Sequence, residues 1–280
     1  MSDASPTLPG GPLELDDVRL VYNRGRADEV AALRGVTLRA APGEFITVIG
    51  SNGAGKSSIV QVVSGAARPT TGRVRIGGRD ITRWPDYRRA PLIARVFDDP
   101  RVGSAPDLSI EDNLALAMSR GRRRGLRASL TSARRRVMRE RLAHLGLGLE
   151  DRLHDRVGLL SAGQRQSLTM VMAGLAAPQV LLLDEHLAAL DPSTAQRVLG
   201  LTGELVAEMS CTTVMITHNM EHALRMGTRL LLMSRGRILA DLGADRKKNM
   251  NTQDLIDLIA RAGDALGDRT LLPELAVEAV

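Results

Sequence analysis

The amino-acid sequence predicts an α/β fold whose core is a parallel sheet. Short apolar runs such as FITVI (45–49) and QVLLLD (179–184) have the length and composition of strands that are buried on both faces. Segments with helical periodicity separate the later runs, and strands that alternate with helices build parallel sheets. The run at 45–49 is also followed by glycines and then by a helix-forming segment, which is the strand–loop–helix order of a phosphate-binding loop.

Length and composition set the class of protein. With 280 residues and 44% apolar side chains, the chain can form one large α/β core or two small domains, which excludes a disordered protein. The opening residues, MSDASPTLPGGP, lack the basic and apolar segments of a secretory signal, so we expect none. The longest apolar stretch (168–183) is broken by Pro178 and is too short to span a membrane, so we expect a soluble chain. The single cysteine, Cys211, excludes a disulfide or a cysteine-based metal site within one chain, and we expect a buried thiol.

The first hundred residues favour strands. Residues 13–22 alternate loosely and predict one strand, and 32–44 predict a second strand that leads into the core, so we expect a small N-terminal antiparallel sheet. After the helix that follows the glycine-rich loop, residues 68–82 predict a turn, a strand, a Gly-Gly hairpin and a short strand. Residues 92–97, LIARVF, predict another core strand.

Helical periods dominate the middle of the chain. We therefore expect a helical subdomain at about 100–165, inserted in a main domain of 13–245, with a C-terminal helix and tail at 246–280. The clearest helices of the insertion are IEDNLALAMSR and TSARRRVMRERLAHLGL. The later elements are expected in the order helix 161–178, strand 179–184, helix 192–209, strand 213–217, helix 220–227, hairpin 229–241 and amphipathic helix 252–262.

The segment GSNGAGKSS (50–58) fits the pattern GxxxxGK[ST]. Glycines let successive backbone N–H groups converge on one anion, and the new helix adds positive potential at its N-terminus. The side chain of Lys56 can reach the terminal phosphates, and the Ser57 hydroxyl can hold Mg²⁺. A glycine-rich turn that fits by chance is the alternative, which the strand before and the helix after disfavour. The predicted phosphate-binding residues are Gly50, Ser51, Asn52, Gly53, Ala54, Gly55, Lys56, Ser57 and Ser58.

Two carboxylates follow the strand at 179–184. Asp184 lies at the carboxyl end of this strand, where open α/β sheets bind ligands, and offers Mg²⁺ a carboxylate opposite Ser57. Glu185 is then free to polarise a water for attack on a γ-phosphate. A helix-capping turn is the alternative for this pair, and the phosphate-binding loop makes it improbable.

The segment LLSAGQRQ (159–166) predicts a second anion site. Ser161 can cap a helix whose first amides, with Gly163 and Gln164, face an anion. One chain cannot easily use both sites on one phosphate. We therefore expect a head-to-tail dimer in which Ser161 and Gly163 of one copy close over the γ-phosphate that Lys56 of the other copy holds.

Taken in order, GSNGAGKSS, LLSAGQRQ, LLLDEHLAALDP and THNMEHAL resemble the nucleotide-binding subunits of ATP-binding-cassette (ABC) transporters over roughly residues 13–245. The resemblance implies a RecA-like P-loop NTPase core with an N-terminal antiparallel β-subdomain and an inserted α-helical subdomain, which hydrolyses ATP with Mg²⁺. Tyr22 matches the aromatic residue that stacks on adenine, His218 the switch histidine at the γ-phosphate, and Asp191 the residue that communicates across the dimer. A half-exposed strand tyrosine and a hydrogen-bonded polar histidine are the alternatives for Tyr22 and His218. The remaining four histidines, His144, His154, His186 and His222, are expected to be ordinary structural residues.

Two positions depart from the family pattern. Asp98, in VFDDP, stands where the family usually has a glutamine that touches Mg²⁺ or the attacking water and senses the membrane partner. A carboxylate can also ligate Mg²⁺, but it adds negative charge near a polyanion unless the metal or an arginine screens it. Ala162 replaces the first glycine of the LLSAGQRQ segment, and we expect a small effect unless a positive φ is needed there.

The resemblance extends to bacterial importer ATPases assigned to tryptophan, tyrosine or unidentified small solutes. It implies transmembrane permease subunits on other chains, an extracytoplasmic solute-binding protein as an indirect partner, and a peripheral position on the cytoplasmic face of the inner membrane. No nucleic acid is expected. The rival reading, a soluble ABC ATPase that acts on nucleic acid or ribosomes, rests on ten arginines within residues 120–141, which are most simply a solvated helix face. A weakly hydrolytic regulator, suggested by Asp98, is a third possibility.

Overall fold

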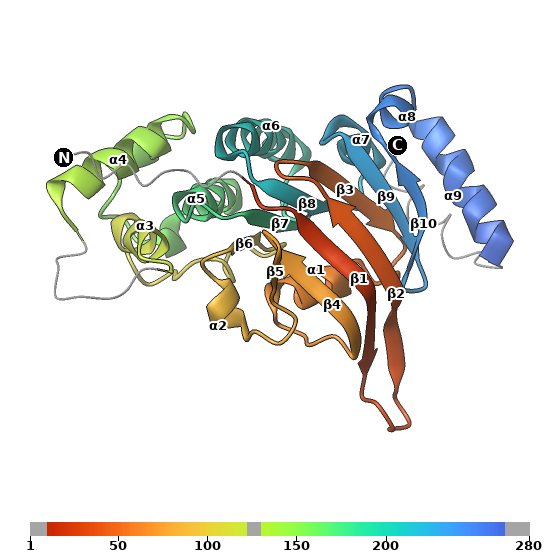
Figure 1. The fold of residues 1–280 in the computed structure, drawn as a ribbon. Helices are drawn as coiled ribbons and strands as arrows, with labels where there is room; N and C mark the ends of the chain where they lie inside the picture. Colours follow the sequence, from red (N-terminus) through yellow and green to blue (C-terminus); the bar gives the residue numbers. More distant parts are fainter. Residues whose placement is uncertain (1–9, 122–129, 267–280) are drawn as a thin grey trace.

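The computed structural model describes residues 10–121 and 130–266. Its N-terminal part is an antiparallel four-stranded sheet with the strand order β2-β1-β4-β5, which confirms the antiparallel sheet expected there. Two of its strands come from beyond the first helix, so the chain leaves this sheet, crosses the core and returns (Figure 1). Its strands are β1 (Leu13–Tyr22), β2 (Val30–Ala40), β4 (Thr71–Ile76) and β5 (Arg79–Asp80).

The second sheet is the predicted core. It has six strands in the order β10-β9-β3-β8-β7-β6, all parallel except β10, which pairs antiparallel with β9. The carboxyl ends of its central strands therefore meet at one edge. Its strands are β3 (Phe45–Gly50), β6 (Ile93–Val96), β7 (Val180–Asp184), β8 (Thr212–Ile216), β9 (Arg229–Ser234) and β10 (Arg237–Leu242).

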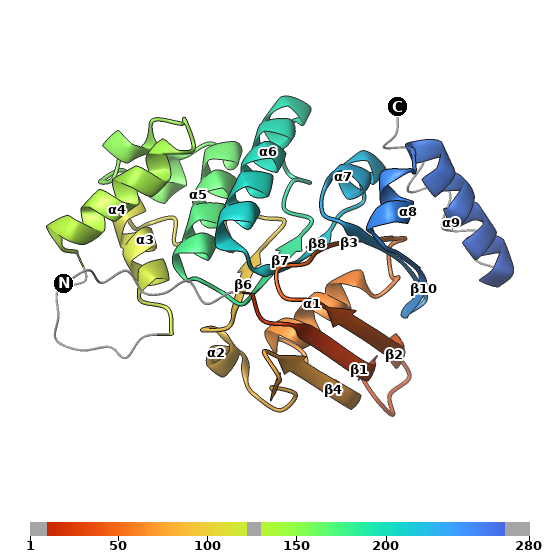
Figure 2. The same ribbon diagram turned by 45° about the horizontal axis from the view of Figure 1, so that its top comes forward.

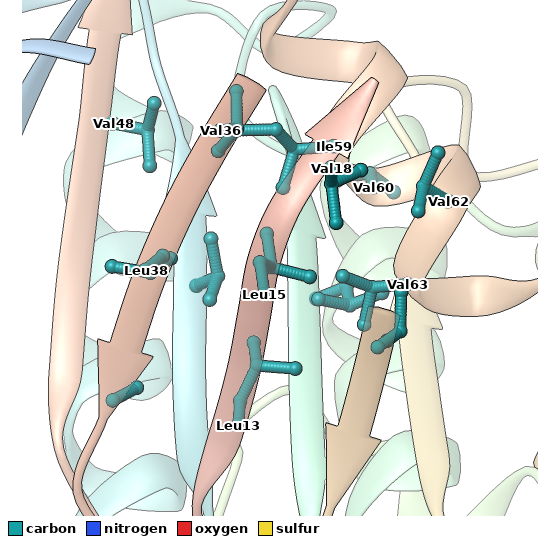
Figure 3. Close-up of a cluster of buried hydrophobic side chains, with 14 of the residues drawn as sticks. Leu13, Leu15, Val18, Val36, Leu38, Val48, Ile59, Val60, Val62 and Val63 are labelled. Atoms are coloured by element: carbon teal, nitrogen blue, oxygen red, sulfur yellow. The ribbon is translucent and has the colours of Figure 1, made fainter. Parts of the chain in front are cut away.

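Helices cover both faces of the core sheet (Figure 2). Helix α1 (Lys56–Ser64) lies between the two sheets, and one buried cluster joins its side chains to both of them. In Figure 3, Leu15 and Leu38 of the antiparallel sheet point toward the same apolar layer as Ile59 of α1. The opposite face is covered by α5 (Ala162–Leu175), α6 (Pro192–Met209) and α7 (Met220–Arg225).

The helical region has its own apolar core. Helix α3 (Ile110–Met118) begins after the capping residue Ser109, and α4 (Ser132–Ala143) begins after Thr131. Both pack with α5 and two short 3₁₀ turns, Leu149–Asp151 and Val157–Leu159, around a cluster that contains Leu114, Met138 and Leu168. The boundaries near 100 and 165 stay a prediction, because α5 belongs to this cluster and also covers the core sheet. Helix α2 (Asp86–Arg89), which the sequence reading did not include, precedes β6.

The chain beyond the core sheet is helical. Helix α9 (Thr252–Leu266) confirms the expected amphipathic helix and buries Leu255 and Ile259 against β9 and α7. Helix α8 (Ala244–Lys248) was not expected. Among the described residues, no helix has both the length and the apolarity that crossing a membrane requires. The expectations for the first nine residues, for the arginines within 122–129 and for the tail after 266 fall outside the described residues.

Candidate nucleotide-binding and hydrolysis site

The glycine-rich loop connects the end of β3 to the start of α1, and two of its glycines are required by close backbone contacts. A Cβ on Gly50 would lie 2.2 Å from the carbonyl oxygen of Met233, and one on Gly55 would lie 2.6 Å from that of Ala32. Gly55 also has a φ of 99° and directly precedes α1, which has no side-chain cap. The first amides of α1 therefore keep their free hydrogen-bonding capacity for a ligand.

Lys56 lies inside this loop rather than on the surface. Its side chain is buried, and Nζ donates to the backbone oxygens of Gly50 at 2.6 Å and Ser51 at 3.1 Å. Asn52, Gly53 and Ser57 are exposed along the outer side of the loop. The loop thus gathers an ammonium, a hydroxyl and backbone amides, which are groups that bind phosphate.

One cavity of about 300 Å³ brings together residues that are distant in sequence. It is lined by the loop residues 52–58, by Tyr22 and residues 30–32 of the antiparallel sheet, and by Glu185. The Tyr22 hydroxyl donates to Oε1 of Gln61 on α1 at 2.7 Å, which fixes the ring beside the loop. An aromatic ring at one end and a carboxylate at the other suit a nucleotide whose base and phosphates need different surroundings.

Asp184 ends β7 and forms an ion pair that the sequence reading missed. Arg95, on the neighbouring strand β6, donates from Nη2 to Oδ2 of Asp184 at 2.7 Å. Burial raises the pKa of Asp184, Arg95 opposes this shift, and the charges of Glu185 and Asp98 raise the pKa further. The available signal was an arginine inside the apolar run LIARVF, because a charge in a buried strand needs a partner.

Glu185 and His218 contact each other. They follow the adjacent strands β7 and β8, and Nε2 of His218 lies 2.6 Å from Oε1 of Glu185. The hydrogen bond from His218 lowers the pKa of Glu185 against the opposing effect of burial, and the positive charge of Lys56 lowers it further. The carboxylate is therefore ionised at neutral pH and stands within the electrostatic reach of the loop.

The start of α5 has the expected capping geometry but lies outside the cavity. Ser161 accepts from the backbone N–H of Gln164 at 3.2 Å, and the Gln164 side chain accepts from the backbone N–H of Ser161 at 3.1 Å. Gly163 is buried, and a Cβ there would lie 2.3 Å from Cγ2 of Thr194 on α6. Ala162 has no positive φ, so the alanine fits this backbone. None of these four residues lines the cavity around the phosphate-binding loop.

Two further side chains hold the surrounding segments. Asp191 caps α6 by accepting from the backbone N–H of Thr194 at 3.0 Å and from the Ser193 hydroxyl at 2.7 Å, and these bonds hold its pKa well below the usual range. The buried Gln166 side chain donates to the backbone oxygens of Phe97 at 3.1 Å and His186 at 2.7 Å. It thereby joins the segments that carry Asp98 and Glu185. The sequence reading assigned Gln166 no role.

His186 is a structural residue, as the sequence analysis expects. The ring is fully buried, Nε2 lies 3.1 Å from the Thr202 hydroxyl, and burial lowers its pKa to about 3. It is therefore neutral at neutral pH.

The donor set fits Mg²⁺. Asp184 and the Ser57 hydroxyl offer oxygen ligands at the carboxyl edge of the sheet. Asp98 is exposed, and its charge raises the pKa of Asp184. Among residues 10–121 and 130–266, no group of three histidine, cysteine or acidic side chains forms a metal cage. A site with one or two carboxylates, whose other ligands are water and phosphate oxygens, is the arrangement that Mg²⁺ prefers.

Comparison with known proteins agrees with the fold and the site. The family model described as ABC transporter matches residues 33–188. The tyrosine transport ATP-binding protein of Clostridioides difficile is 39% identical over 215 residues, which cover 77% of this chain and 85% of that protein. The methionine import ATP-binding protein of Brucella abortus is 33% identical over 252 residues, but the match spans only 64% of its length.

Solved structures agree as well. A dimeric ATP-binding cassette in a post-hydrolysis state, bound to ADP and Pi, superimposes with a TM-score of 0.71 at 26% identity and covers 83% of this chain and 98% of its own. The family match covers more than half of the chain, and the match to the solved cassette covers most of it. The chain therefore belongs to the ABC transporter family, as one of its ATP-binding and ATP-hydrolysing subunits.

Proposed function

We propose that this subunit binds ATP·Mg²⁺ between Tyr22 and the phosphate-binding loop and uses its hydrolysis to drive the import of a small solute, such as an amino acid, through separate transmembrane permease subunits. The observation that carries the proposal is the single cavity that gathers Tyr22, the loop around Lys56 and Glu185. The protein is then peripheral, on the cytoplasmic face of the inner membrane, and an extracytoplasmic solute-binding protein is an indirect partner.

Each residue of the cavity has a proposed role. The ring of Tyr22 stacks on adenine, the loop amides and Lys56 hold the β- and γ-phosphates, and Glu185 accepts a proton from the attacking water. His218 orients Glu185 through their 2.6 Å contact. Ser57 and Asp184, with Asp98, are the proposed metal ligands. When bound there, Mg²⁺ would supply positive charge that neutralises the charge developing on the phosphate oxygens.

The start of α5 supports a head-to-tail dimer. Its exposed Ser161, with Gly163 and Gln164, forms a helix N-terminus outside the cavity of its own chain. In a sandwich of two copies, this N-terminus would close the ATP site of the partner, because an anion there is favoured by the amides and the helix dipole. The dimeric state of the related cassette supports the same arrangement.

The permease is proposed to dock in a groove between the core sheet and the helical region. This groove has a volume of about 280 Å³ and is lined by Tyr87, Arg95, Phe97 and Arg120, among others. Tyr87 is 70% exposed, which is unusual for a large aromatic side chain and typical of a binding surface. A cytoplasmic helix of the permease placed here would contact the β6 segment that leads to Asp98.

The names of the relatives give tyrosine, methionine and phosphonates as cargo, which supports a small solute, and the first two favour an amino acid. The solute itself has no proposed contact with this chain. Ion pairs also weaken the nucleic-acid alternative, since Arg135 contacts Glu111 and Arg141 contacts Glu208 within the described part of the basic segment.

The test is to express tagged Glu185→Gln protein in its native host, solubilise the membranes with ATP·Mg²⁺, and identify the proteins that copurify. The substitution removes the base and traps the ATP-bound dimer, so a stoichiometric multi-span membrane protein is expected. Glu221→Gln, an exposed glutamate on α7, is the matched control and should hydrolyse ATP normally. Recovery only in the soluble fraction, with RNA or ribosomes attached, would overturn the transporter proposal.

A further inference from the structure

Arg95 connects the candidate metal site to the groove proposed for the permease. Its Nη2 contacts the carboxylate of Asp184, while its side chain also lines the groove. The guanidinium carbon lies 4.4 Å from the centre of the Phe97 ring, so the planar group stacks on an aromatic face on its way to Asp184. One side chain therefore touches both proposed sites.

The ion pair of Arg95 with Asp184 is strong but incomplete. The Asp184 side chain is 11% exposed and that of Arg95 is 20% exposed, so water screens their attraction little. Within the described chain, however, Nε of Arg95 is buried with no hydrogen-bond partner. Of the five N–H donors, one hydrogen bonds to Asp184, and the guanidinium also contacts the Phe97 ring, so little besides the ion pair holds Arg95 in place.

Two acidic residues of the candidate metal site, Asp184 and Asp98, can interact with Arg95. Arg95 occupies Oδ2 of Asp184, and its positive charge repels a cation, so Arg95 opposes the binding of Mg²⁺ to this carboxylate. Asp98 follows Arg95 by three residues, is exposed, and acts electrostatically on Asp184. A released Arg95 therefore has a second carboxylate within the same electrostatic field.

We propose that Arg95 is a positioning residue that competes with Mg²⁺ for Asp184, and that Asp98 balances the charge of Arg95 once Asp184 binds the metal. The inference rests on the proposed role of Asp184 as a metal ligand. It assigns Asp98 to a charge pair with Arg95 in place of the metal-ligand role proposed above, and the double variant distinguishes the two roles. It also places the competition at the groove, where a docked partner that holds Arg95 would free Asp184.

The test measures binding rather than turnover, with Mn²⁺ as a spectroscopic substitute for Mg²⁺. ATP affinity without metal is measured in EDTA, and Mn²⁺ affinity of the ATP-bound chain is measured by electron paramagnetic resonance. The variants are Arg95→Met, Asp98→Gln and the double variant. The matched controls are Arg101→Met and Asp99→Asn, which disrupt the neighbouring exposed ion pair at 3.1 Å.

Opposite shifts are expected from the two single variants. Arg95→Met removes the competitor, so Mn²⁺ affinity rises by roughly tenfold while metal-free ATP affinity falls by a few-fold, as the loss of one nearby charge predicts. Asp98→Gln leaves the displaced Arg95 without a partner, so Mn²⁺ affinity falls by a similar factor. The double variant should match Arg95→Met, because Asp98 has no released arginine to hold once Arg95 is gone, and the two controls should remain at the parent value.

Two results would overturn the inference. Unchanged Mn²⁺ affinity in Arg95→Met would show that Arg95 does not compete, and simple additivity in the double variant would show that Arg95 and Asp98 act independently. Arg95→Gln, which keeps a donor for Asp184 without the charge, repeats the test if the methionine variant is unstable. If the parent chain itself bound neither ATP nor Mn²⁺, the proposed function would fail first, and the two failures are thus distinguishable.

Discussion

Glu185 has a φ of 51°, in the left-handed region that side chains with a Cβ seldom adopt. Its backbone N–H still donates to the Ile216 oxygen at 3.1 Å, so the sheet holds this conformation. The turn directs the carboxylate away from β7 and toward His218. A strained backbone at this position is consistent with a side chain selected for chemistry rather than for stability.

At the residue scale, Tyr22 gives a test of the base-binding side of the cavity. Tyr22→Ala is expected to weaken ATP binding by roughly tenfold or more, because stacking of an aromatic ring on a base contributes about 1–3 kcal/mol. Tyr22→Phe keeps the ring and loses only the contacts of the hydroxyl with Gln61 and Ser58, so its ATP affinity should remain near that of the parent. Equilibrium dialysis with ATP measures both. Equal losses in the two variants would assign the effect to the hydroxyl and contradict stacking.

At the element scale, the contact of α5 with α6 depends on Gly163. Gly163→Ala would place a methyl group 2.3 Å from Cγ2 of Thr194, and overpacking of this kind destabilises a protein by about 1–3 kcal/mol. The free energy of unfolding, measured in urea, should fall accordingly. Thr194→Ser removes the opposing methyl group, so the double variant should recover most of the loss.

Gly200, inside α6, is the matched control for Gly163. A Cβ there meets nothing within 4 Å, and alanine favours a helix interior over glycine, so Gly200→Ala should raise the free energy of unfolding by about 0.5–1 kcal/mol. If the free energy of unfolding of Gly163→Ala equalled that of this control, α5 and α6 would be able to move apart without loss of stability.

Helix α8 is held to the core by a buried lysine. Lys247 is 3% exposed, and its Nζ donates to the Thr47 hydroxyl at 3.1 Å and to backbone oxygens at the end of α7, those of Met226 and Gly227. Burial lowers its pKa to about 8, below the value of 10.5 for a free lysine. Between these two values the unfolded chain binds more protons than the folded chain, so this group makes stability rise with pH there.

The pH prediction compares the parent with Lys247→Met. From about pH 7.5 to about pH 9.5, the parent should gain about 1–2 kcal/mol of unfolding free energy relative to the variant, with no relative change below about pH 7. Urea unfolding at each pH measures this difference. A parallel pH dependence of the two proteins would mean that the folded and unfolded states of Lys247 titrate alike.

At the scale of the whole molecule, the head-to-tail dimer makes a prediction about mixed subunits. Lys56→Ala destroys the phosphate-binding loop, and Ser161→Glu places a negative charge where the partner's γ-phosphate is proposed to lie. A dimer with one copy of each variant has one site with both defects and one intact site. An equal mixture should therefore recover about a quarter of the parent ATPase activity, whereas each variant alone has almost none. No recovery, despite subunit exchange shown by pull-down, would contradict this arrangement.

Local sequence patterns predicted much of the fold and the phosphate-binding loop. The strands at 45–50 and 180–184, the helix after Lys56 and the cap at Ser161 follow from apolar runs, glycine spacing and side-chain capping, all of which act within a few residues. The order of the motifs and their separations, which are properties of the whole chain, indicated the family. The short α2 and α8 were missed, since helices of four and five residues leave almost no periodic signal.

By itself, the sequence determined that this chain has a phosphate-binding loop, a carboxylate pair at a strand end and a parallel core sheet. Only the tertiary structure decided which of these groups meet. The contacts of Arg95 with Asp184, of His218 with Glu185, and of Gly163 with Thr194 each join elements that are separate in sequence. The physical reason is that strand order and helix packing set such contacts, and a linear pattern of residue types specifies neither.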